Sequence, residues 1–232
     1  MAKRFGDECF SIPRVMKEER FEFSDEKIGI VFPVFYLGIP KIVEEFLGRV
    51  SLKSDYVFAV ATYGSLCGAF EKKLLKIGEK AGIKFSYINA VLMIDNYLPY
   101  FSIDVQKEKE ASKHIEENIA KTVKEVEAGD HHICRHSPLW NLPGHLLEFH
   151  DRGFERKFLA GNECTGCGIC EKVCPVDNVK LQEKPVFSHN CLHCLACISH
   201  CPVKAIRLPG EKSETRFINQ HISVKEIIDS NN

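Results

Sequence analysis

The sequence predicts two folded parts, an α/β domain built on a parallel, doubly wound sheet and a smaller α+β domain rich in cysteine. Three observations predict this division. Short apolar runs alternate with amphipathic segments over residues 1–128. Eight of the eleven cysteines lie between Cys164 and Cys201. The cysteine-rich part also contains an internal repeat, because nineteen residues from Glu163 recur 27 positions further on. Such a duplication predicts two similar halves.

Alternating strands and helices are expected in the first part. Residues 27–35, 55–61 and 83–94 are nearly continuous apolar runs, which are typical of strands covered on both faces. Helices are expected over 39–50, 65–81 and 106–127, and a further strand over 9–15. Strands that alternate with helices of this length predict right-handed crossovers and a parallel sheet.

Local signals support these three helices. Pro40 suits a first helical turn and Gly48 lies near the end of the same segment. Gly82 suits a left-handed C-cap after residue 81. Apolar residues recur at helical spacing in the last two segments. In 65–81 they are Leu66, Phe70, Leu74 and Ile77, and in 106–127 they are Ile115, Ile119, Val123 and Val126.

Composition excludes several function classes. The chain has 31 basic and 32 acidic residues and a net charge of -1, so neither nucleic acid nor an anionic membrane is expected as its main partner. The longest apolar stretch, 28–40, is interrupted by Gly29 and Pro33 and is too short to span a bilayer. The first ten residues lack an apolar signal core, which predicts a cytoplasmic protein.

Residues 129–158 show no clear periodicity and are expected to connect the two domains, 1–128 and 159–208, while 209–232 reads as a polar tail. Five of the ten histidines surround Cys134 in this connector: His131, His132, His136, His145 and His150. They are either solvated linker side chains or ligands of a further zinc or iron site.

The repeat carries the strongest chemical signal. Each half reads C-x2-C-x2-C-x3-C-P. Three cysteines at this spacing converge on three corners of a cubane, and the fourth sulfur must come from elsewhere. This is the pattern of bacterial two-cluster ferredoxins, in which the fourth cysteine of each run ligates the other cluster. The sequence therefore predicts two [4Fe-4S] clusters, one on Cys164, Cys167, Cys170 and Cys201, the other on Cys191, Cys194, Cys197 and Cys174.

Neighbouring residues fit this interpretation. Gly166 and Gly168 let the first loop approach its cluster closely. Pro175 and Pro202 stop a helix from continuing. Structural zinc is the alternative, but it prefers paired knuckles separated by longer loops. Three histidines flank the cysteines: His189, His193 and His200. They are either hydrogen-bond donors near the clusters or surface residues.

The chain resembles bacterial and archaeal fusions of a flavodoxin-like domain with a C-terminal two-cluster ferredoxin. The similar stretches are EFSDEKIGIVFPVFYLGIPKIVEEFL, YVFAVATYGSLCG, MIDNYLP and KPVFSHNCLHCLACISHCPVKAI. The resemblance covers nearly the whole chain. It implies electron transfer, flavin mononucleotide (FMN) in the first domain, two [4Fe-4S] clusters in the second, and the flavodoxin strand order 2-1-3-4-5.

The chain departs from this family at its start. The T-G-N-containing loop that cradles the flavin phosphate does not occur, and the strand before it, which would lie between 9–15 and 27–35, is missing. Either the start is assigned too far downstream, or the chain has lost flavin or pairs with a separate element. The remaining FMN candidates are Tyr36 and the turn Thr62, Tyr63 and Gly64.

Two functions follow from these observations. The first, which the sequence favours, is an electron carrier that exchanges single electrons with a redox partner protein. The second is an iron–sulfur flavoprotein oxidoreductase that uses FMN in the first domain. A non-redox zinc module is a third. Outside the repeat, Cys9, Cys67 and Cys134 are expected to be buried as small apolar side chains, with a nucleophilic Cys67 as the alternative.

Overall fold

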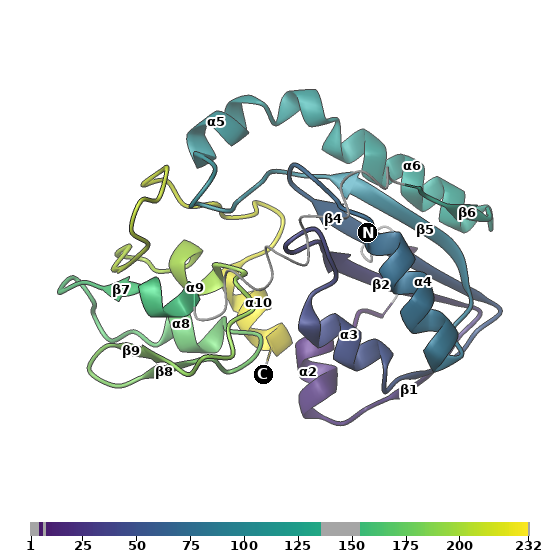
Figure 1. Ribbon diagram of the computed structural model, residues 1–232, viewed down its shortest axis with the longest axis horizontal. Coiled ribbons are helices and arrows are strands. Elements are labelled where there is room, and N and C mark those ends of the chain that lie inside the picture. Colours follow the sequence, from purple (N-terminus) through teal and green to yellow (C-terminus); the bar gives the residue numbers. More distant parts are fainter. Residues whose placement is uncertain (1–4, 7, 136–153, 232) are drawn as a thin grey trace. The chain divides into compact units, whose positions relative to one another are not determined.

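The computed structural model describes residues 5–6, 8–135 and 154–231 (Figure 1). The chain forms two compact units, Met1–Ile94 with Lys109–His150 and Asp95–Glu108 with Asp151–Asn232. The segment Asp95–Glu108, which the sequence analysis assigned to the first domain, therefore belongs to the second unit. Each unit is described by itself below. Trp140, His136, His145 and His150 lie outside the described residues.

The first unit is built on a parallel four-stranded sheet, which confirms a mixed α/β fold. The strand order is β2 (Lys27–Pro33), β4 (Tyr56–Tyr63), β5 (Phe85–Leu92) and β6 (His132–Ile133). Ile30 lies beside Ala59, Ala59 beside Ile88, and Ile88 beside Ile133. This row is apolar on one face, which fixes the register of the sheet against its core.

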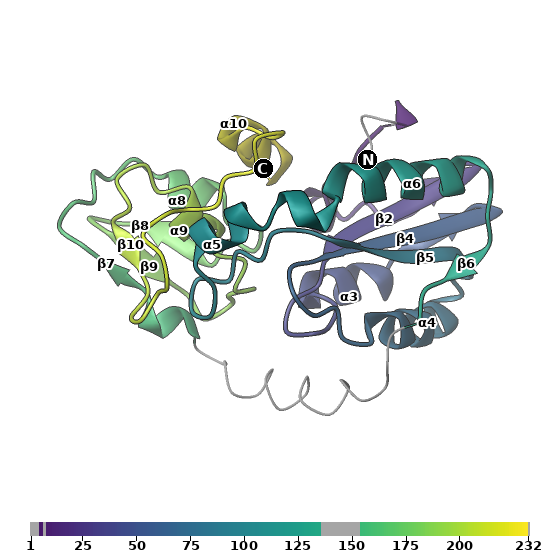
Figure 2. The ribbon, with the colours of Figure 1, turned by 90° about the horizontal axis from the view of Figure 1, so that it is seen from above.

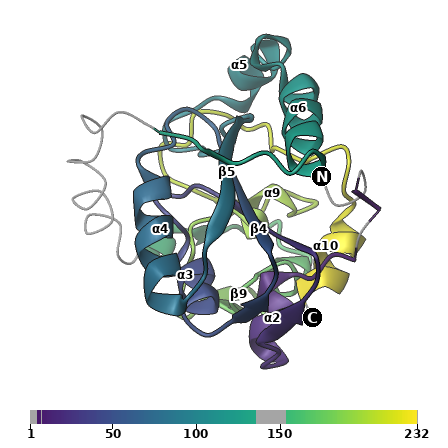
Figure 3. The same cartoon turned by 90° about the vertical axis from the view of Figure 1, so that its right-hand side faces the viewer.

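Helices cover both faces of this sheet. Figure 2 shows α6 (Ile115–Glu127) on one side and α3 (Lys41–Leu47) with α4 (Phe70–Ala81) on the other. Figure 3 shows the same layers end-on. The larger core gathers Ile30, Leu47, Phe70 and Leu74 on the α3 and α4 side. A smaller core around Phe58 and Tyr87 includes Val126 of α6.

Strand β2 differs from the prediction because only one of its faces is buried. Ile30 and Phe32 point into the core, but Val31 is 48% exposed. Within the described residues, β2 pairs only with β4, so its other edge is open. A groove of about 550 Å³ runs along it, lined by residues between Phe5 and Phe58.

The prediction of a strand over 9–15 is wrong. Helix α2 (Ile12–Lys17) occupies this stretch, with Pro13 in its first turn, where proline's fixed φ favours a helix. The parallel pair that precedes the main sheet is instead β1 (Glu22–Ser24) with β3 (Ser51–Lys53), directly before β2 and β4 in the chain.

The helices after β2 and β4 are shorter than predicted at their starts. Helix α3 begins after Pro40, which is its N-cap residue, and ends at Gly48. Helix α4 begins only at Phe70, so Leu66 lies outside it and is 47% exposed. The predicted C-cap is confirmed, since Gly82 has φ 70° in the left-handed region.

The single helix predicted over 106–127 is divided. Helix α5 (Ile103–Glu108) and a 3-10 turn, η1 (Ala111–Lys113), precede α6, and His114 between them has φ 47°. The charged residues before Ile115 offer no apolar stripe to bury. Lys113 Nζ instead donates to the carbonyls of Gly64 and Met93, 3.0 and 2.6 Å away, which holds the start of α6 beside the sheet.

The second unit repeats one arrangement twice. The first half contains β7 (Leu159–Ala160), α8 (Ile169–Lys172) and β8 (Val179–Leu181). The second half contains β9 (Pro185–Phe187), α9 (Ala196–Ser199) and β10 (Ile206–Arg207). Strand β7 pairs antiparallel with β10, and β8 with β9. The first strand of each half therefore pairs with the last strand of the other, as two halves related by an approximate two-fold axis would.

The segment after 208, predicted as a polar tail, packs onto this unit. Arg216, 7% exposed, forms an ion pair with Glu211 at 3.1 Å. Ser213 and Thr215 donate hydrogen bonds to the Asp104 carboxylate. Helix α10 (Val224–Asn231) ends where Asn231 Nδ2 donates to the carbonyl of Val173 at 3.1 Å. In the parts of the chain that are described, no helix is long and apolar enough to cross a membrane.

We expect Gly68→Ala to destabilise the first unit. Gly68 has φ 61°, and a Cβ atom there would lie 2.1 Å from the Leu37 carbonyl oxygen, where the loops after β2 and β4 meet. Gly82→Ala is the matched control, since its φ is 70° with no atom within 4 Å. Both substitutions destabilise the fold by about 1–2 kcal/mol because alanine is strained in the left-handed region. Overpacking adds roughly 1–3 kcal/mol of destabilisation for Gly68→Ala.

The measurement is thermal unfolding followed by circular dichroism under anaerobic conditions. The melting temperature should fall further for Gly68→Ala than for Gly82→Ala. Equal melting temperatures would contradict the close packing of these two loops.

Candidate metal centre

The cysteines of each half lie on a loop that leads into a four-residue helix. Helix α8 follows Gly168 and helix α9 follows Leu195, and each helix contains the third cysteine of its run. The fourth cysteine follows each helix after a short turn, and a proline then prevents further helix. Both helices occupy the same positions of the repeat, so the local fold of the two runs is the same.

The two loops use the same backbone conformation with different residues. Gly166 and Gly168 have φ 67° and 74°, and the corresponding residues of the second half, His193 and Leu195, have φ 59° and 57°. Glycine adopts this region without steric cost, whereas the backbone of other residues is strained there. The glycines of the first loop were predicted to allow a close approach, but nothing in the sequence pattern indicates that a histidine takes the same conformation in the second.

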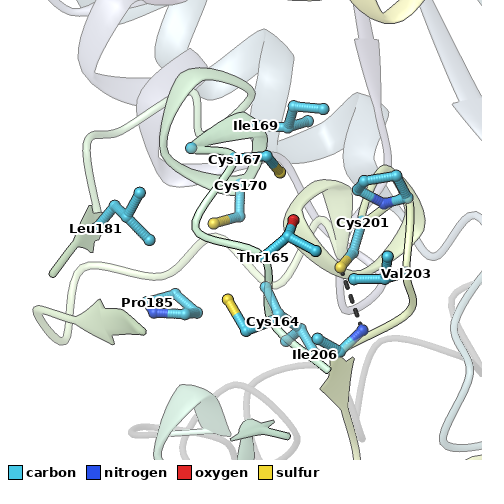
Figure 4. A pocket seen from close by; sticks show the side chains of 13 residues that line it. Cys164, Thr165, Cys167, Ile169, Cys170, Leu181, Pro185, Cys201, Val203 and Ile206 are labelled. Atoms are coloured by element: carbon cyan, nitrogen blue, oxygen red, sulfur yellow. Dashed lines mark hydrogen bonds between the residues drawn. The ribbon is translucent and has the colours of Figure 1, made fainter. Parts of the chain in front are cut away.

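The eight cysteines line two separate pockets. One is lined by Cys164, Cys167, Cys170 and Cys201, and Figure 4 shows these four side chains around it. The other is lined by Cys174, Cys191, Cys194 and Cys197. Each pocket is thus lined by three cysteines from one half of the repeat and one from the other. Ligation of one cluster by each set stays a prediction.

Burial makes four of these thiols poor acids in the absence of a metal. It raises the pKa of Cys170 and of Cys194 to about 11 and that of Cys191 to about 12, and it also raises the pKa of Cys197. Neighbouring cysteines raise these values further because thiolates repel one another. A bound cation reverses this balance, since a thiol that coordinates a metal is deprotonated.

Backbone N–H groups point at the sulfurs at equivalent places. Asn178 N donates to Cys174 Sγ and Ala205 N to Cys201 Sγ, both at 3.2 Å. His193 N donates to Cys191 Sγ at 3.3 Å. Such donors stabilise negative charge on sulfur and tune the potential of a bound cluster.

Asn178 has a second role that the sequence did not reveal. Its side chain is buried, and its Oδ1 accepts a hydrogen bond from Asn190 N at 2.6 Å. Its carbonyl accepts one from Ser188 N at 2.9 Å. Asn178 therefore ties the end of the first half to the start of the second, next to Cys174 and Cys191.

The donor set and its surroundings fit an iron–sulfur cluster. Four sulfurs in one pocket are the ligand set of a [4Fe-4S] cluster. Apolar side chains surround them, with Leu181, Val203 and Ile206 in the first pocket and Val176, Val179 and Leu195 in the second. Such a shell limits solvent access, which is one of the factors that set a cluster's potential.

A buried acid lies beside the second pocket, and the sequence analysis missed it. Glu155, on the 3-10 turn η3 (Phe154–Lys157), is only 2% exposed. Its Oε1 lies 2.8 Å from His189 Nδ1 and its Oε2 4.0 Å from His193 Nε2. Glu155 precedes the repeat in a stretch without periodicity, so no sequence signal singled it out.

The residues predicted to hold FMN lie at the carboxyl ends of β2 and β4. Tyr36 forms part of a tight turn that Phe35 and Gly38 close by hydrogen bonds of 2.8 and 3.1 Å. Thr62 and Tyr63 are the last residues of β4, and burial raises the pKa of Tyr63. FMN binding at these loops stays a prediction.

Of the three cysteines outside the repeat, Cys67 and Cys134 are buried as predicted, but Cys9 is exposed. The prediction for Cys9 is wrong because no strand forms over 9–15 to carry it into the core. Burial raises the pKa of Cys67, and that of Cys134 to about 12, which disfavours the reactive thiolate. His131 and His132 pack against Tyr56 and Tyr87.

A family model described as a 4Fe-4S dicluster domain matches residues 163–205. The match supports a ferredoxin-like region that binds at least one [4Fe-4S] cluster through the cysteines between 164 and 201. No curated protein and no solved structure is significantly similar to the chain.

We expect Asn178→Ala to weaken the second unit. The backbone donor to Cys174 remains, and alanine is the residue at the equivalent position 205, but the N–H of Asn190 loses its hydrogen-bond partner. Loss of such a hydrogen bond costs about 0.5–1.5 kcal/mol. The half-life of the iron–sulfur absorbance in a chelator should therefore fall several-fold.

Asn162→Ala serves as the control for this variant. It removes an exposed asparagine whose Oδ1 contacts Lys184, so it should leave that half-life nearly unchanged. Equal half-lives for the two variants would show that Asn178 does not hold the halves together.

Proposed function

We propose that this chain is an electron-transfer protein that holds two [4Fe-4S] clusters and exchanges single electrons with a redox partner protein. When bound, such a cluster supplies reversible one-electron chemistry. The grouping of the cysteines is the observation that carries the proposal. Two pockets of four sulfurs each provide two complete ligand sets, Cys164, Cys167, Cys170 and Cys201, and Cys174, Cys191, Cys194 and Cys197.

The protein's own residues bind the clusters and adjust their surroundings. Thiolates supply the ligands, the apolar shell excludes water, and backbone N–H groups of Asn178, His193 and Ala205 donate to sulfur. None of these roles requires an acid–base group next to a substrate. The arrangement therefore favours a carrier, in which the protein positions the clusters and tunes their potentials.

We base the proposed position of the partner contact on the exposure of the cysteines. Cys167 is exposed, and Val203 of the same pocket is 40% exposed. In the second set, Cys174 and Cys197 are buried, and Cys191 and Cys194 are half-buried. We therefore place the contact with the redox partner over Cys167 and Val203, where an incoming electron has the least protein to cross.

Double substitutions test the exchange of the fourth cysteine between the halves. The native chain should bind about eight iron atoms, and Cys174→Ala and Cys197→Ala should each retain about four. Because both residues line the second pocket, the double variant Cys174→Ala/Cys197→Ala should also retain about four. Combining Cys174→Ala with Cys170→Ala should remove nearly all iron, because these residues line different pockets.

Iron and acid-labile sulfide are measured on anaerobically purified protein, with Cys9→Ala as the control outside both pockets. The proposal fails if the native chain binds zinc instead of iron. The exchange fails if Cys174→Ala/Cys170→Ala retains as much iron as Cys174→Ala alone.

Flavin analysis tests the alternative function, an FMN-dependent oxidoreductase. We expect the chain of this sequence to purify without flavin, because it contains no T-G-N loop that would cradle the FMN phosphate. The measurement is flavin fluorescence in the supernatant after denaturation. One FMN per chain would instead place the cofactor in the first unit and support the oxidoreductase.

A further inference from the structure

We infer that the buried carboxylate of Glu155 lowers the reduction potential of the second cluster, the one ligated by Cys174, Cys191, Cys194 and Cys197, and thereby makes the two clusters unequal. This inference rests on the proposed function. It concerns Glu155 as a residue that acts on the cluster through space, without ligating it.

Distance is the first argument. One carboxylate oxygen of Glu155, one ring nitrogen of His193 and the sulfur of Cys191 all lie within 4.8 Å of one another. Cys191 lines the second pocket, so the carboxylate lies within 4.8 Å of a ligand sulfur. The negative charge of this carboxylate would repel an electron added to the cluster.

Burial is the second argument. Glu155 is 2% exposed, so water screens its charge little. Phe154 and Phe158 pack edge to face beside it, and Phe158 also lines the second pocket. A negative charge in such surroundings acts strongly on a group a few ångströms away, and net charge is one of the factors that set cluster potentials.

The backbone of the second loop provides a third, independent argument. His193 adopts φ 59°, where the first loop has Gly166. Histidine is strained in this left-handed conformation relative to glycine. Its ring packs on Phe154, with a distance of 4.9 Å between ring centroids, and lies beside Glu155. The His193 ring thus connects the second loop to the buried acid.

The first cluster site has no counterpart to this arrangement. Cys164 corresponds to Cys191 in the repeat, yet over residues 5–6, 8–135 and 154–231 it belongs to no comparable trio of acidic, histidine and cysteine side chains. The nearest acid in sequence, Glu163, is exposed to solvent. The surroundings of the two pockets thus differ by the buried carboxylate of Glu155.

The test is an anaerobic redox titration of the full, cluster-loaded chain, followed by electron paramagnetic resonance. Two one-electron steps are expected. Glu155→Gln removes the charge at nearly constant size, so it should raise the equilibrium constant for reduction of one step about tenfold, equal to about 59 mV, and leave the other within about twofold. Glu155→Asp keeps the charge and should leave both steps close to native.

Glu163→Gln is the matched control, because it removes an exposed carboxylate next to Cys164 and should move neither step. The inference is overturned if Glu155→Gln shifts neither step, shifts both equally, or lowers one. If Glu155→Gln and Glu155→Ala bind no clusters while Glu155→Asp does, the inference also fails, because Glu155 would then be needed for assembly. The iron and sulfide content of the native chain tests the proposed function separately. Failure of the proposed function can therefore be distinguished from failure of this inference.

Discussion

The gathering of eight cysteine side chains around two apolar pockets is the constraint on which the second unit depends. A thiolate in such a pocket is costly without a cation, as the raised pKa values of Cys170, Cys191 and Cys194 indicate. Metal binding supplies the cation, and its free energy then contributes to folding. Because each pocket takes one cysteine from the opposite half, neither half can complete its site alone. Strand pairing also joins the two halves, since β7 pairs with β10 and β8 with β9.

Within this symmetry, small differences between the halves carry the functional detail. The loops share their backbone conformation, but glycines in the first half correspond to His193 and Leu195 in the second. The first loop leaves Cys167 exposed, whereas the second is covered by Phe154 and Phe158 and approached by Glu155. The two pockets thus have different surroundings, one with an exposed cysteine and one beside a buried carboxylate.

Much of the second unit could be predicted from the sequence, and less of the first. The grouping of the cysteines was predicted from the repeated spacing together with the pattern of two-cluster ferredoxins, in which the fourth cysteine of each run ligates the other cluster. Glu155 and Asn178 could not be found, since their roles depend on contacts across the repeat rather than on any pattern along the chain. In the first unit, apolar runs located β2, β4 and β5, but they did not show that one face of β2 is exposed, because burial of that face depends on what packs there. The short stretch over 9–15 was misassigned because Pro13 in a first helical turn outweighs a weak apolar pattern.

The number of electrons that one chain accepts tests the central claim most directly. Coulometric reduction of the anaerobic, cluster-loaded protein measures it without depending on iron that is bound elsewhere. Two [4Fe-4S] clusters predict about two electrons per chain and a reduced spectrum broadened by the interaction between two nearby spins. Uptake of one electron, or of none, by a chain with all eight cysteines intact would contradict the account.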